Sequence, residues 1–294
     1  MKAEDPSDVR FHVDAWLPPE MAERAESVGA KKASLDFWTM LALGILAGAF
    51  IALGSLFSTT ITASPLPYGV NRLLGGIAFS LGLILVIVAG AELFTGNNLI
   101  VMAWANKKVT SARLLRSWLI VYAGNLIGAM ATAVLVFLAK QYSFGGGAVG
   151  KNALAIAQNK CSLGAVQAVA LGILCNGLVC LAVWLCYSAR TTTDKVVSII
   201  FPITAFVAAG FEHSVANMYF IPAGLLIKTY APLEYWNLIH ESASSYDALT
   251  WLGLLRNLVP VTLGNTLGGS LLVGLVYWFI YLRNPHRPDS SDRT

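Results

Sequence analysis

Charged residues are scarce in this chain of 294 residues. Only 12% are Asp, Glu, Lys or Arg, whereas 56% are hydrophobic, and soluble domains carry about 25% charged residues. This deficit excludes an ordinary water-facing surface and indicates a protein that crosses a membrane several times. The mean hydropathy of +0.64 agrees with that class.

Motifs for catalysis and for metal binding are also missing. The chain contains no H-E-x-x-H, no G-x4-G-K-[ST] and no G-x-S-x-G. Its four histidines are scattered and show no ligand spacing, so we expect no metal, no cofactor and no enzymatic activity. We also expect no nucleic-acid partner. Cysteine is rare, and Cys175, Cys180 and Cys186 lie in one apolar stretch, where they are expected to pack as small side chains rather than pair.

Apolar runs are what the sequence does contain. A helix that spans a bilayer needs roughly 20 apolar residues, and six segments reach that length: residues 37–59, 73–107, 114–139, 163–187, 196–228 and 255–282. We therefore predict an all-α membrane protein with a transmembrane domain over 37–283. A polar N-terminal segment, 1–36, precedes it, and a disordered tail, 284–294, follows it.

The distribution of basic residues predicts the orientation. With both ends of the chain in the cytoplasm, 14 of the 20 Lys and Arg residues fall on cytoplasmic segments, as the positive-inside rule requires. Residues 1–36 do not resemble a signal peptide. We expect them to form an amphipathic lead-in on the membrane surface, with a turn at Pro18 and Pro19. The predicted location is the inner membrane, in contact with lipid.

Three short patterns occur twice, in the same order. GAELFTGN (90–97) and GFEHSVAN (210–217) share G-x-E-x4-N, and ALGIL occurs at 42–46 and at 170–174. LLRSWLIVYAGNLIG (114–128) and LLRNLVPVTLGNTLG (254–268) share LLR and GNxxG. The repeated unit contains three spans, an odd number, so its two copies must have opposite orientations in the membrane. The sequence therefore predicts a three-plus-three inverted repeat, the plan of many transport proteins.

The G-x-E-x4-N stretches interrupt the second and fifth spans, which are too long for one straight crossing. Gly90, Gly96 and Gly210 would permit helix breaks, and broken backbone at membrane depth must face protein or a watery cavity. Glu92 and Glu212 are costly at that depth. We expect each carboxylate to bind freed backbone N–H groups at its own break, a structural role rather than contact with substrate. The asparagines that end the two motifs, Asn97 and Asn217, are also expected to stabilise the helix breaks.

His213 is the only histidine inside a predicted span, and it lies in a break beside a glutamate. Because imidazole titrates near neutral pH, we predict that it lines a pathway. In the other copy, Thr95 lies two residues beyond the position equivalent to His213, and a Thr95–His213 hydrogen bond is predicted across the pseudo-two-fold axis. Lys160 has two interpretations. From the sequence alone, an interfacial lysine that reaches the headgroups is favoured; if Lys160 points inward, it would attract a small anion.

Two other classes of protein were weighed. An intramembrane hydrolase would need a nucleophile and a base at the breaks, but Ser214 and His213 are adjacent, and neighbours on a helix do not face one another. A scaffold that conducts nothing would have no reason to retain polar breaks in two spans. Both classes explain the repeated motif less well than transport does.

Several motifs resemble those of the formate/nitrite transporter family. The resemblance extends from about residue 15 to residue 284 and is carried by AELFTGN (91–97), YAGNLIGA (122–129), CNGLVCLAVW (175–184), GFEHSVANMYFIP (210–222) and VPVTLGNTLGG (259–269). It implies an aquaporin-like fold of six helices with the second and fifth broken. It also implies a homopentamer with a separate pore in each protomer.

The resemblance assigns residues as well. It implies a pathway with the polar residues His213, Thr95, Lys160 and Asn176, a gating loop over 93–98, and apolar positions at an outer constriction (Phe79, Phe206), an inner constriction (Leu93, Phe94, Val179) and the chamber between (Leu83). The implied substrate is a small monovalent anion, formate first, with protons taken up alongside it at low pH. Nitrite and hydrosulfide remain alternatives, because the FTG of the first break is shared with other branches of the family.

Overall fold

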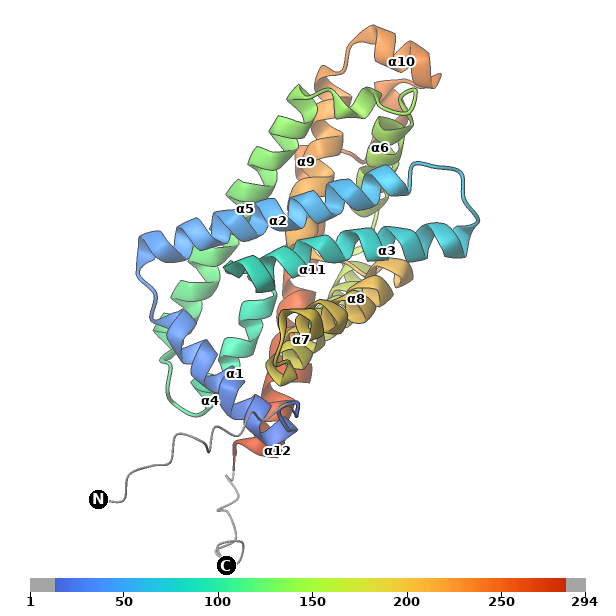
Figure 1. The fold of residues 1–294 in the computed structure, drawn as a ribbon. Helices are drawn as coiled ribbons and strands as arrows, with labels where there is room; N and C mark the ends of the chain where they lie inside the picture. The colour runs from blue at the N-terminus through green and yellow to red at the C-terminus, as the bar shows by residue number, and fades with distance from the viewer. Residues whose placement is uncertain (1–13, 284–294) are drawn as a thin grey trace, which may run out of the picture.

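The computed structural model describes residues 14–283. This part of the chain consists of helices and the segments that connect them, and it contains no strands (Figure 1). The first half contains α1 (Pro18–Ala33), α2 (Phe37–Ile61), α3 (Tyr68–Ile84), a π-helical turn η1 (Leu85–Gly90), a 3-10 turn η2 (Gly96–Ile100), α4 (Val101–Ala105) and α5 (Ser111–Leu138). The second half contains η3 (Gln141–Ser143), α6 (Ala148–Cys161), α7 (Ala165–Ser188), α8 (Thr192–Ala209), α9 (Ser214–Tyr230), α10 (Leu233–Ile239), η4 (Ala243–Ser245), α11 (Trp251–Leu267), η5 (Gly268–Leu275) and α12 (Val276–Tyr281).

Six segments of the described chain are long and apolar enough to cross a membrane, as predicted. The predicted second span is α3 with η1, a break, η2 and α4, and the predicted fifth span is α8, a break and α9. The third and sixth spans begin a few residues earlier than expected, at Ser111 and Trp251. The tail predicted to be disordered, 284–294, lies outside the described residues.

Local capping explains where several helices begin. The Asp36 carboxylate accepts hydrogen bonds from the backbone N–H groups of Trp38 and Thr39, so α2 starts directly after it. The expected turn at Pro18 and Pro19 is wrong, because Pro18 is the first residue of α1. Proline is well tolerated at that position, where its missing N–H would have had no helical partner.

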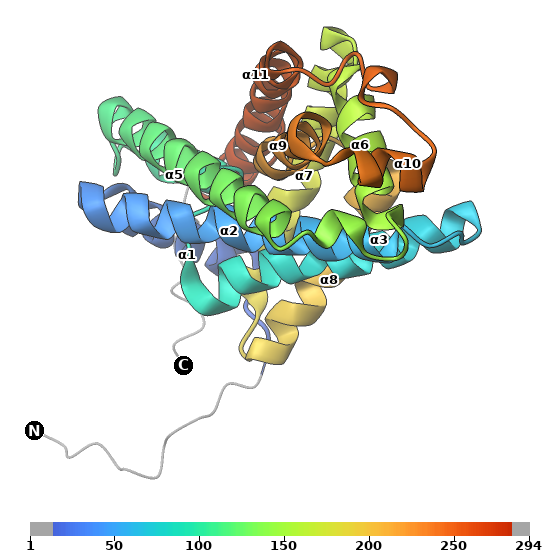
Figure 2. The ribbon, with the colours of Figure 1, turned by 90° about the horizontal axis from the view of Figure 1, so that it is seen from above.

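The two halves repeat one arrangement with opposite direction. α2 packs along α5 and α3 as α7 packs along α11 and α8, and Figure 2 shows α5 running across α2. The helices cross closely at the repeated GNxxG motifs. A Cβ on Gly124 would lie 2.9 Å from the Leu41 carbonyl oxygen, and a Cβ on Gly264 would lie 2.3 Å from that of Val169. Glycine is therefore required at both crossings, and the inverted repeat is confirmed.

Each half also begins with a helix that the sequence did not clearly indicate. α1, expected only as a lead-in, packs against α4, α7 and α12, and α6, which was not predicted, packs against α9. They lie at opposite ends of the molecule, which we call the α1 end and the α6 end (Figure 1). Both helices contribute a lysine to the site described below.

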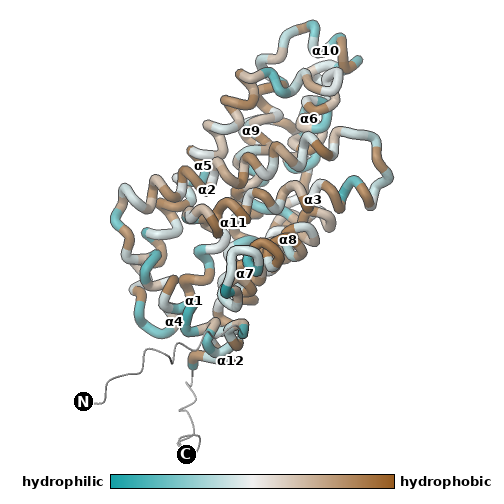
Figure 3. The backbone as a smooth tube through the Cα atoms, in the orientation of Figure 1, coloured by the Kyte–Doolittle hydropathy of each residue, from teal (hydrophilic) through white to brown (hydrophobic). Residues whose placement is uncertain are grey.

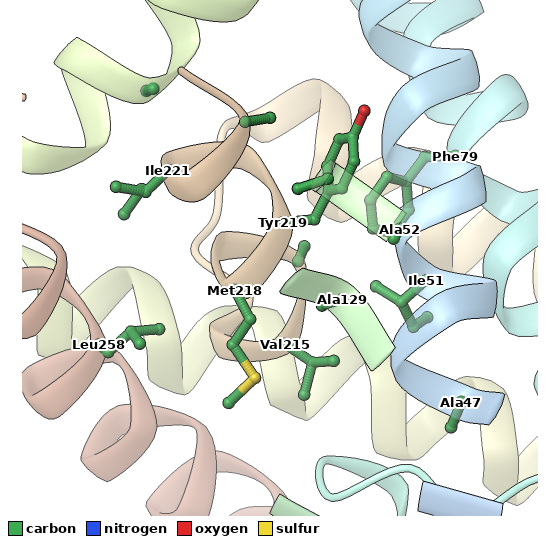
Figure 4. Close-up of a cluster of buried hydrophobic side chains, with 14 of the residues drawn as sticks. Ala47, Ile51, Ala52, Phe79, Ala129, Val215, Met218, Tyr219, Ile221 and Leu258 are labelled. Atoms are coloured by element: carbon green, nitrogen blue, oxygen red, sulfur yellow. The ribbon is translucent and has the colours of Figure 1, made fainter. Parts of the chain in front are cut away.

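The core surrounds α9, in which 12 of the 17 residues are buried. Figure 4 shows Ile221 with Leu258 of α11 on one side of α9, and Tyr219 with Phe79 of α3 and Ala52 of α2 on the other. The outer surfaces of the spans are apolar (Figure 3): Trp38 and Phe201 are each 74% exposed. Such a surface suits contact with lipid or with other subunits.

Candidate functional site

Both predicted helix breaks are present. The chain leaves the helix at Gly90, with φ of +86°, and at Gly210, with φ of +76°, a region that L-residues rarely adopt. Gly96 has no positive φ, so its predicted part in the break is wrong; it begins the 3-10 turn η2 instead. The extended residues after each break leave backbone groups without helical partners, and these groups need partners elsewhere.

One asparagine side chain supplies those partners at the first break. Asn125 of α5 donates from Nδ2 to the carbonyl oxygens of Gly44, at 2.8 Å, and Glu92, at 2.9 Å. Its Oδ1 accepts from the N–H of Phe94 at 2.9 Å. The Glu92 N–H in turn donates to the carbonyl oxygen of Leu43. The first break is thus hydrogen-bonded to α2 and α5.

The second break is held in the same way by Asn265 of α11. Its Nδ2 donates to the carbonyl oxygens of Gly172, at 2.8 Å, and Glu212, at 2.9 Å, and its Oδ1 accepts from the Ser214 N–H at 2.9 Å. The Glu212 N–H donates to Leu171. Asn125 and Asn265 are the asparagines of the two GNxxG motifs, so the sequence signal for these residues was available although their role was not recognised.

The glutamates therefore do not bind freed backbone N–H groups, and that prediction is wrong. The Glu212 carboxylate instead accepts from Asn217 Nδ2 at 2.6 Å and forms an ion pair with Lys160 Nζ at 2.8 Å. Asn257 Nδ2 donates to the same carboxylate and to the Lys160 carbonyl oxygen. Lys160 points inward, and its side chain is only 14% exposed. The alternative favoured by sequence alone, a lysine that reaches the headgroups, does not hold.

Glu92 has a matching set of partners at the α1 end. Its carboxylate accepts from Asn97 Nδ2 at 2.7 Å and lies 3.1 Å from Lys32 Nζ, which also donates to Asn97 Oδ1. Sequence reasoning missed Lys32. A signal was present, because Lys32 and Lys160 are separated by 128 residues, the same offset as the two ALGIL stretches.

The predicted hydrogen bond between Thr95 and His213 is present. Thr95 Oγ1 and His213 Nε2 lie 3.0 Å apart, with both residues buried. His213 Nδ1 accepts from the backbone N–H of Ala216 at 3.0 Å, so the imidazole caps α9. Because a backbone N–H can only donate, Nδ1 carries no proton and the neutral ring has its proton on Nε2. Nε2–H is therefore the donor to Thr95.

Asn176 of α7 joins this pair to the second repeat. Its Nδ2 lies within hydrogen-bond distance of the carbonyl oxygens of Thr95, at 3.2 Å, and Asn265, at 2.7 Å, and of Asn98 Oδ1, at 2.8 Å. Asn176 is completely buried. It therefore fixes the backbone that carries Thr95, while Asn265 fixes the backbone next to His213.

Two cavities approach the Thr95–His213 pair from opposite ends. The α6-end cavity has a volume of about 490 Å³ and is lined by Lys160, His213, Phe79 and Phe206, among others. The α1-end cavity, of about 30 Å³, is lined by residues that include Lys32, Leu83 and Leu93. A water requires roughly 10–15 Å³ of such a cavity, so the smaller cavity has room for about two waters. The two cavities are therefore very unequal in size.

Aromatic rings narrow the larger cavity beside His213. The rings of Phe79 and Phe206 meet edge to face with centroids 5.4 Å apart, and the Phe206 ring stacks on His213 at 6.0 Å. At the proposed inner constriction, Phe94 and Val179 are buried but line neither cavity. The constriction roles of these residues stay predictions.

The intramembrane hydrolase has no support in this geometry. The Ser214 hydroxyl makes no hydrogen bond within the described residues, and both nitrogens of His213 have other partners. The four cysteines are free, and within residues 14–283 no group of His, Cys, Asp and Glu could hold a metal ion.

A six-helix membrane protein with an inverted repeat, two broken helices and buried polar groups where the breaks meet belongs architecturally with channels and transporters. The sequence comparisons place the chain more narrowly: it belongs to the formate/nitrite transporter family, whose sequence model matches residues 19–279.

Individual relatives agree with this assignment. The chain is 44% identical to the formate channel FocA of Escherichia coli K12, over 97% of this chain and 100% of the relative. It is 39% identical to an uncharacterized transporter, YrhG, of Bacillus subtilis, over 93% of this chain and 95% of the relative. Among solved structures, a pentameric formate channel with formate bound is 45% identical, with a TM-score of 0.80 over 84% of this chain and 98% of that one.

Replacing Phe206 with alanine is expected to widen the passage beside His213 and to admit larger anions. A barrier lower by about 1.4 kcal/mol would raise acetate or lactate flux into vesicles about tenfold. Phe201→Ala is the matched control, because Phe201 lies on the same helix but is 74% exposed. Equal acetate flux for both variants would remove Phe206 from the constriction.

Proposed function

We propose that this protein is a channel for small monovalent anions, with formate as its main substrate, in the inner membrane. Each protomer of a homopentamer would provide its own pathway, and both ends of the chain would lie in the cytoplasm. The protein would be a conduit rather than an enzyme. The kinship with formate channels supports the substrate, and the distribution of basic residues supports the orientation.

The observation that carries this proposal is the alignment of polar groups between the two cavities. Lys160 lies at the large cavity and Lys32 at the small one, and the Thr95–His213 pair lies between them where the broken helices meet. Apolar side chains, Phe79 and Phe206, form the wall beside His213. A lysine ammonium is therefore present at each end to donate a hydrogen bond to an anion that arrives, but the anion must lose water to pass the centre, which costs several kcal/mol.

His213 would supply the central interaction in its neutral form. Its Nε2–H, which now donates to Thr95, can donate to a carboxylate oxygen once the Thr95 loop moves. A second proton would have to enter at Nδ1, where it would displace the cap on Ala216 and place a cation at the N-terminus of α9. Both effects are unfavourable, so hydrogen bonding to the anion is the mode proposed for neutral pH.

At low pH, protonation at Nδ1 would make His213 a proton donor. The Nε2 proton would pass to a formate oxygen, and formic acid, now uncharged, would cross the apolar wall at lower cost. The ring would be left neutral, with its proton on Nδ1, and a return to the Nε2–H tautomer would restore the cap on Ala216. The same residue would thus support anion flow at neutral pH and uptake with a proton at acid pH.

Purified protein in vesicles tests the substrate directly. Formate, nitrite, hydrosulfide, acetate and lactate would be offered in turn in a stopped-flow assay, with empty vesicles as the baseline. We expect formate to give the fastest flux. Faster flux of nitrite or hydrosulfide would assign the protein to another branch of the family, and no flux above the baseline would refute the channel.

Replacing His213 with phenylalanine is expected to flatten the pH dependence of formate flux. The substitution removes the titratable ring from the pathway while keeping its approximate size. His240→Phe is the matched control, because His240 lies outside the spans, after α10, and is exposed. A His213→Phe protein with the pH profile of the unmodified chain would exclude His213 from proton transfer.

A further inference from the structure

We propose that Arg72 has two tasks in the large cavity: it supplies the positive charge that no carboxylate neutralises, and it fixes the separation of the two helices that carry Phe79 and Phe206. The proposal rests on the proposed function, because it assigns a residue to the path of the anion. It adds a residue that neither the repeated motifs nor the family resemblance indicated.

The contacts of Arg72 lie at the end of a broken helix. Arg72, in α3, lines the α6-end cavity and donates from Nε to the carbonyl oxygen of Ala208 at 3.0 Å and from Nη2 to that of Val207. These carbonyls belong to the last turn of α8. That of Val207 also accepts from the Gly210 N–H at 3.1 Å, whereas no backbone N–H of the described residues outside the helix bonds to that of Ala208. The guanidinium therefore satisfies the Ala208 carbonyl at the break and adds a second hydrogen bond to that of Val207.

The same two helices form the aromatic wall. α3 and α8 run side by side (Figure 1, Figure 2) and are in close contact at Gly76, where a Cβ would lie 2.8 Å from the Cα of Thr204. Arg72 is four residues before this crossing and Phe79 is three residues after it. On α8, Phe206 directly precedes Val207, so the carbonyl contacts of Arg72 restrain the end of α8 that carries Phe206 against α3. Loss of the contacts would let the aromatic wall open.

The charges around the cavity make Arg72 electrostatically distinct. The charged residues that line it are Arg72, Lys160 and Glu212. Lys160 and Glu212 form an ion pair at 2.8 Å, so their charges largely cancel at a distance. Arg72 bonds only to neutral carbonyls among the described residues. Its charge therefore decides the sign of the potential that an approaching anion meets.

Removal of Arg72 would do more than delete a charge. The C-terminal end of a helix carries roughly half a negative charge, and the end of α8 faces this cavity through Val207, Ala209 and Gly210. Arg72 covers that end. Without it, the negative helix terminus would be uncovered and would repel an anion, and the Lys160–Glu212 pair, whose charges largely cancel, would not offset that repulsion.

Two substitutions separate the tasks. Arg72→Gln removes the charge and the paired contacts, whereas Arg72→Lys keeps the charge but loses the planar fork that reaches two carbonyls. Formate flux would be measured against concentration in vesicles at low and high ionic strength, together with the ratio of acetate to formate flux. Lys151→Gln is the control, because Lys151 of α6 is 51% exposed and pairs with Glu241 outside the cavity.

Arg72→Gln is expected to raise the half-saturation concentration for formate about tenfold at low ionic strength, the low end of the range for charge-focused access. The difference should shrink at high salt, where exposed charges are screened. Arg72→Lys is expected to restore the half-saturation concentration but to keep a raised acetate-to-formate ratio. Lys151→Gln is expected to behave as the unmodified chain.

Each result decides one task. An unchanged half-saturation concentration and salt dependence in Arg72→Gln would overturn the electrostatic task, and an unchanged acetate-to-formate ratio in Arg72→Lys would overturn the positioning task. If Arg72→Gln fails to assemble, the lysine variant tests positioning, and flux of the unmodified chain at increasing ionic strength tests attraction. Unmodified protein that conducts no formate would overturn the proposed function itself, a different outcome from conduction that is indifferent to Arg72.

Discussion

Asn265→Leu is expected to prevent stable folding or to lower the thermal midpoint of the purified protein severely. The substitution leaves the carbonyl oxygen of Glu212 and the N–H of Ser214 without a partner, whereas the Gly172 carbonyl, inside α7, keeps its helical hydrogen bond. Each unsatisfied buried group costs about 1–3 kcal/mol. Two such groups, about 2–6 kcal/mol together, are a large part of the whole stability of a marginally stable domain, about 5–15 kcal/mol.

The inverted repeat provides a second, independent test of this prediction. Asn125 makes the same three hydrogen bonds at the first break, so Asn125→Leu should be destabilising to a similar degree. Asn237→Leu, at an exposed position of α10, should change little. Thermal unfolding followed by fluorescence-detected size exclusion would compare the three variants. Midpoints for both buried variants equal to that of Asn237→Leu would show that the breaks need no asparagine.

The second large effect is expected when Lys160 is replaced by methionine. Glu212, which is buried, would keep its amide partners but lose the cation at 2.8 Å. Breaking a buried ion pair on one side costs about 3–5 kcal/mol, because the remaining charge is left uncompensated. Glu212→Gln in the same chain removes that charge, so the double variant should recover most of the lost stability.

An exposed ion pair of the same type is the control for this prediction. Lys151 and Glu241 lie 2.7 Å apart, but the lysine side chain is 51% exposed, and such pairs contribute about 0–1 kcal/mol. Lys151→Met should therefore lower the midpoint far less than Lys160→Met. Equal losses, or no recovery in the double variant, would contradict the assignment of Lys160 as a buried partner. In flux measurements, Lys160→Met should also weaken the apparent affinity for formate.

The positions of several site residues could be predicted from the motifs that are repeated in the sequence. The two G-x-E-x4-N stretches located both breaks, and Thr95, two residues beyond the position equivalent to His213, was predicted to bond to it, which is the contact observed. These predictions succeeded because a duplicated unit of odd span number has only one way to bring its breaks together. The partner of each glutamate was wrong, because the asparagines that hold the backbone come from helices 33 and 53 residues away in sequence.

Lys160 shows why other contacts of the site could not be predicted from the neighbouring sequence. Its sequence neighbourhood, just before an apolar run, is typical of a lysine at the headgroups. Only the packing of α6 against α9 turns it inward to Glu212. Lys32 on α1 is likewise turned toward Glu92 only by the packing of its helix. Its separation of 128 residues from Lys160 becomes informative once α1 and α6 are seen to occupy matching places in the two repeats.

The sequence by itself determined the membrane class, the six spans, their inverted duplication and the positions of the two breaks. These features depend on hydropathy and on residues that act locally, such as glycine at positive φ. Only the tertiary structure decided which side chains satisfy the broken backbone, which lysines face the glutamates, and that Arg72 covers the end of α8. The physical reason is that hydrogen bonds and ion pairs at a break depend on distance in space, which helices remote in sequence set by their packing.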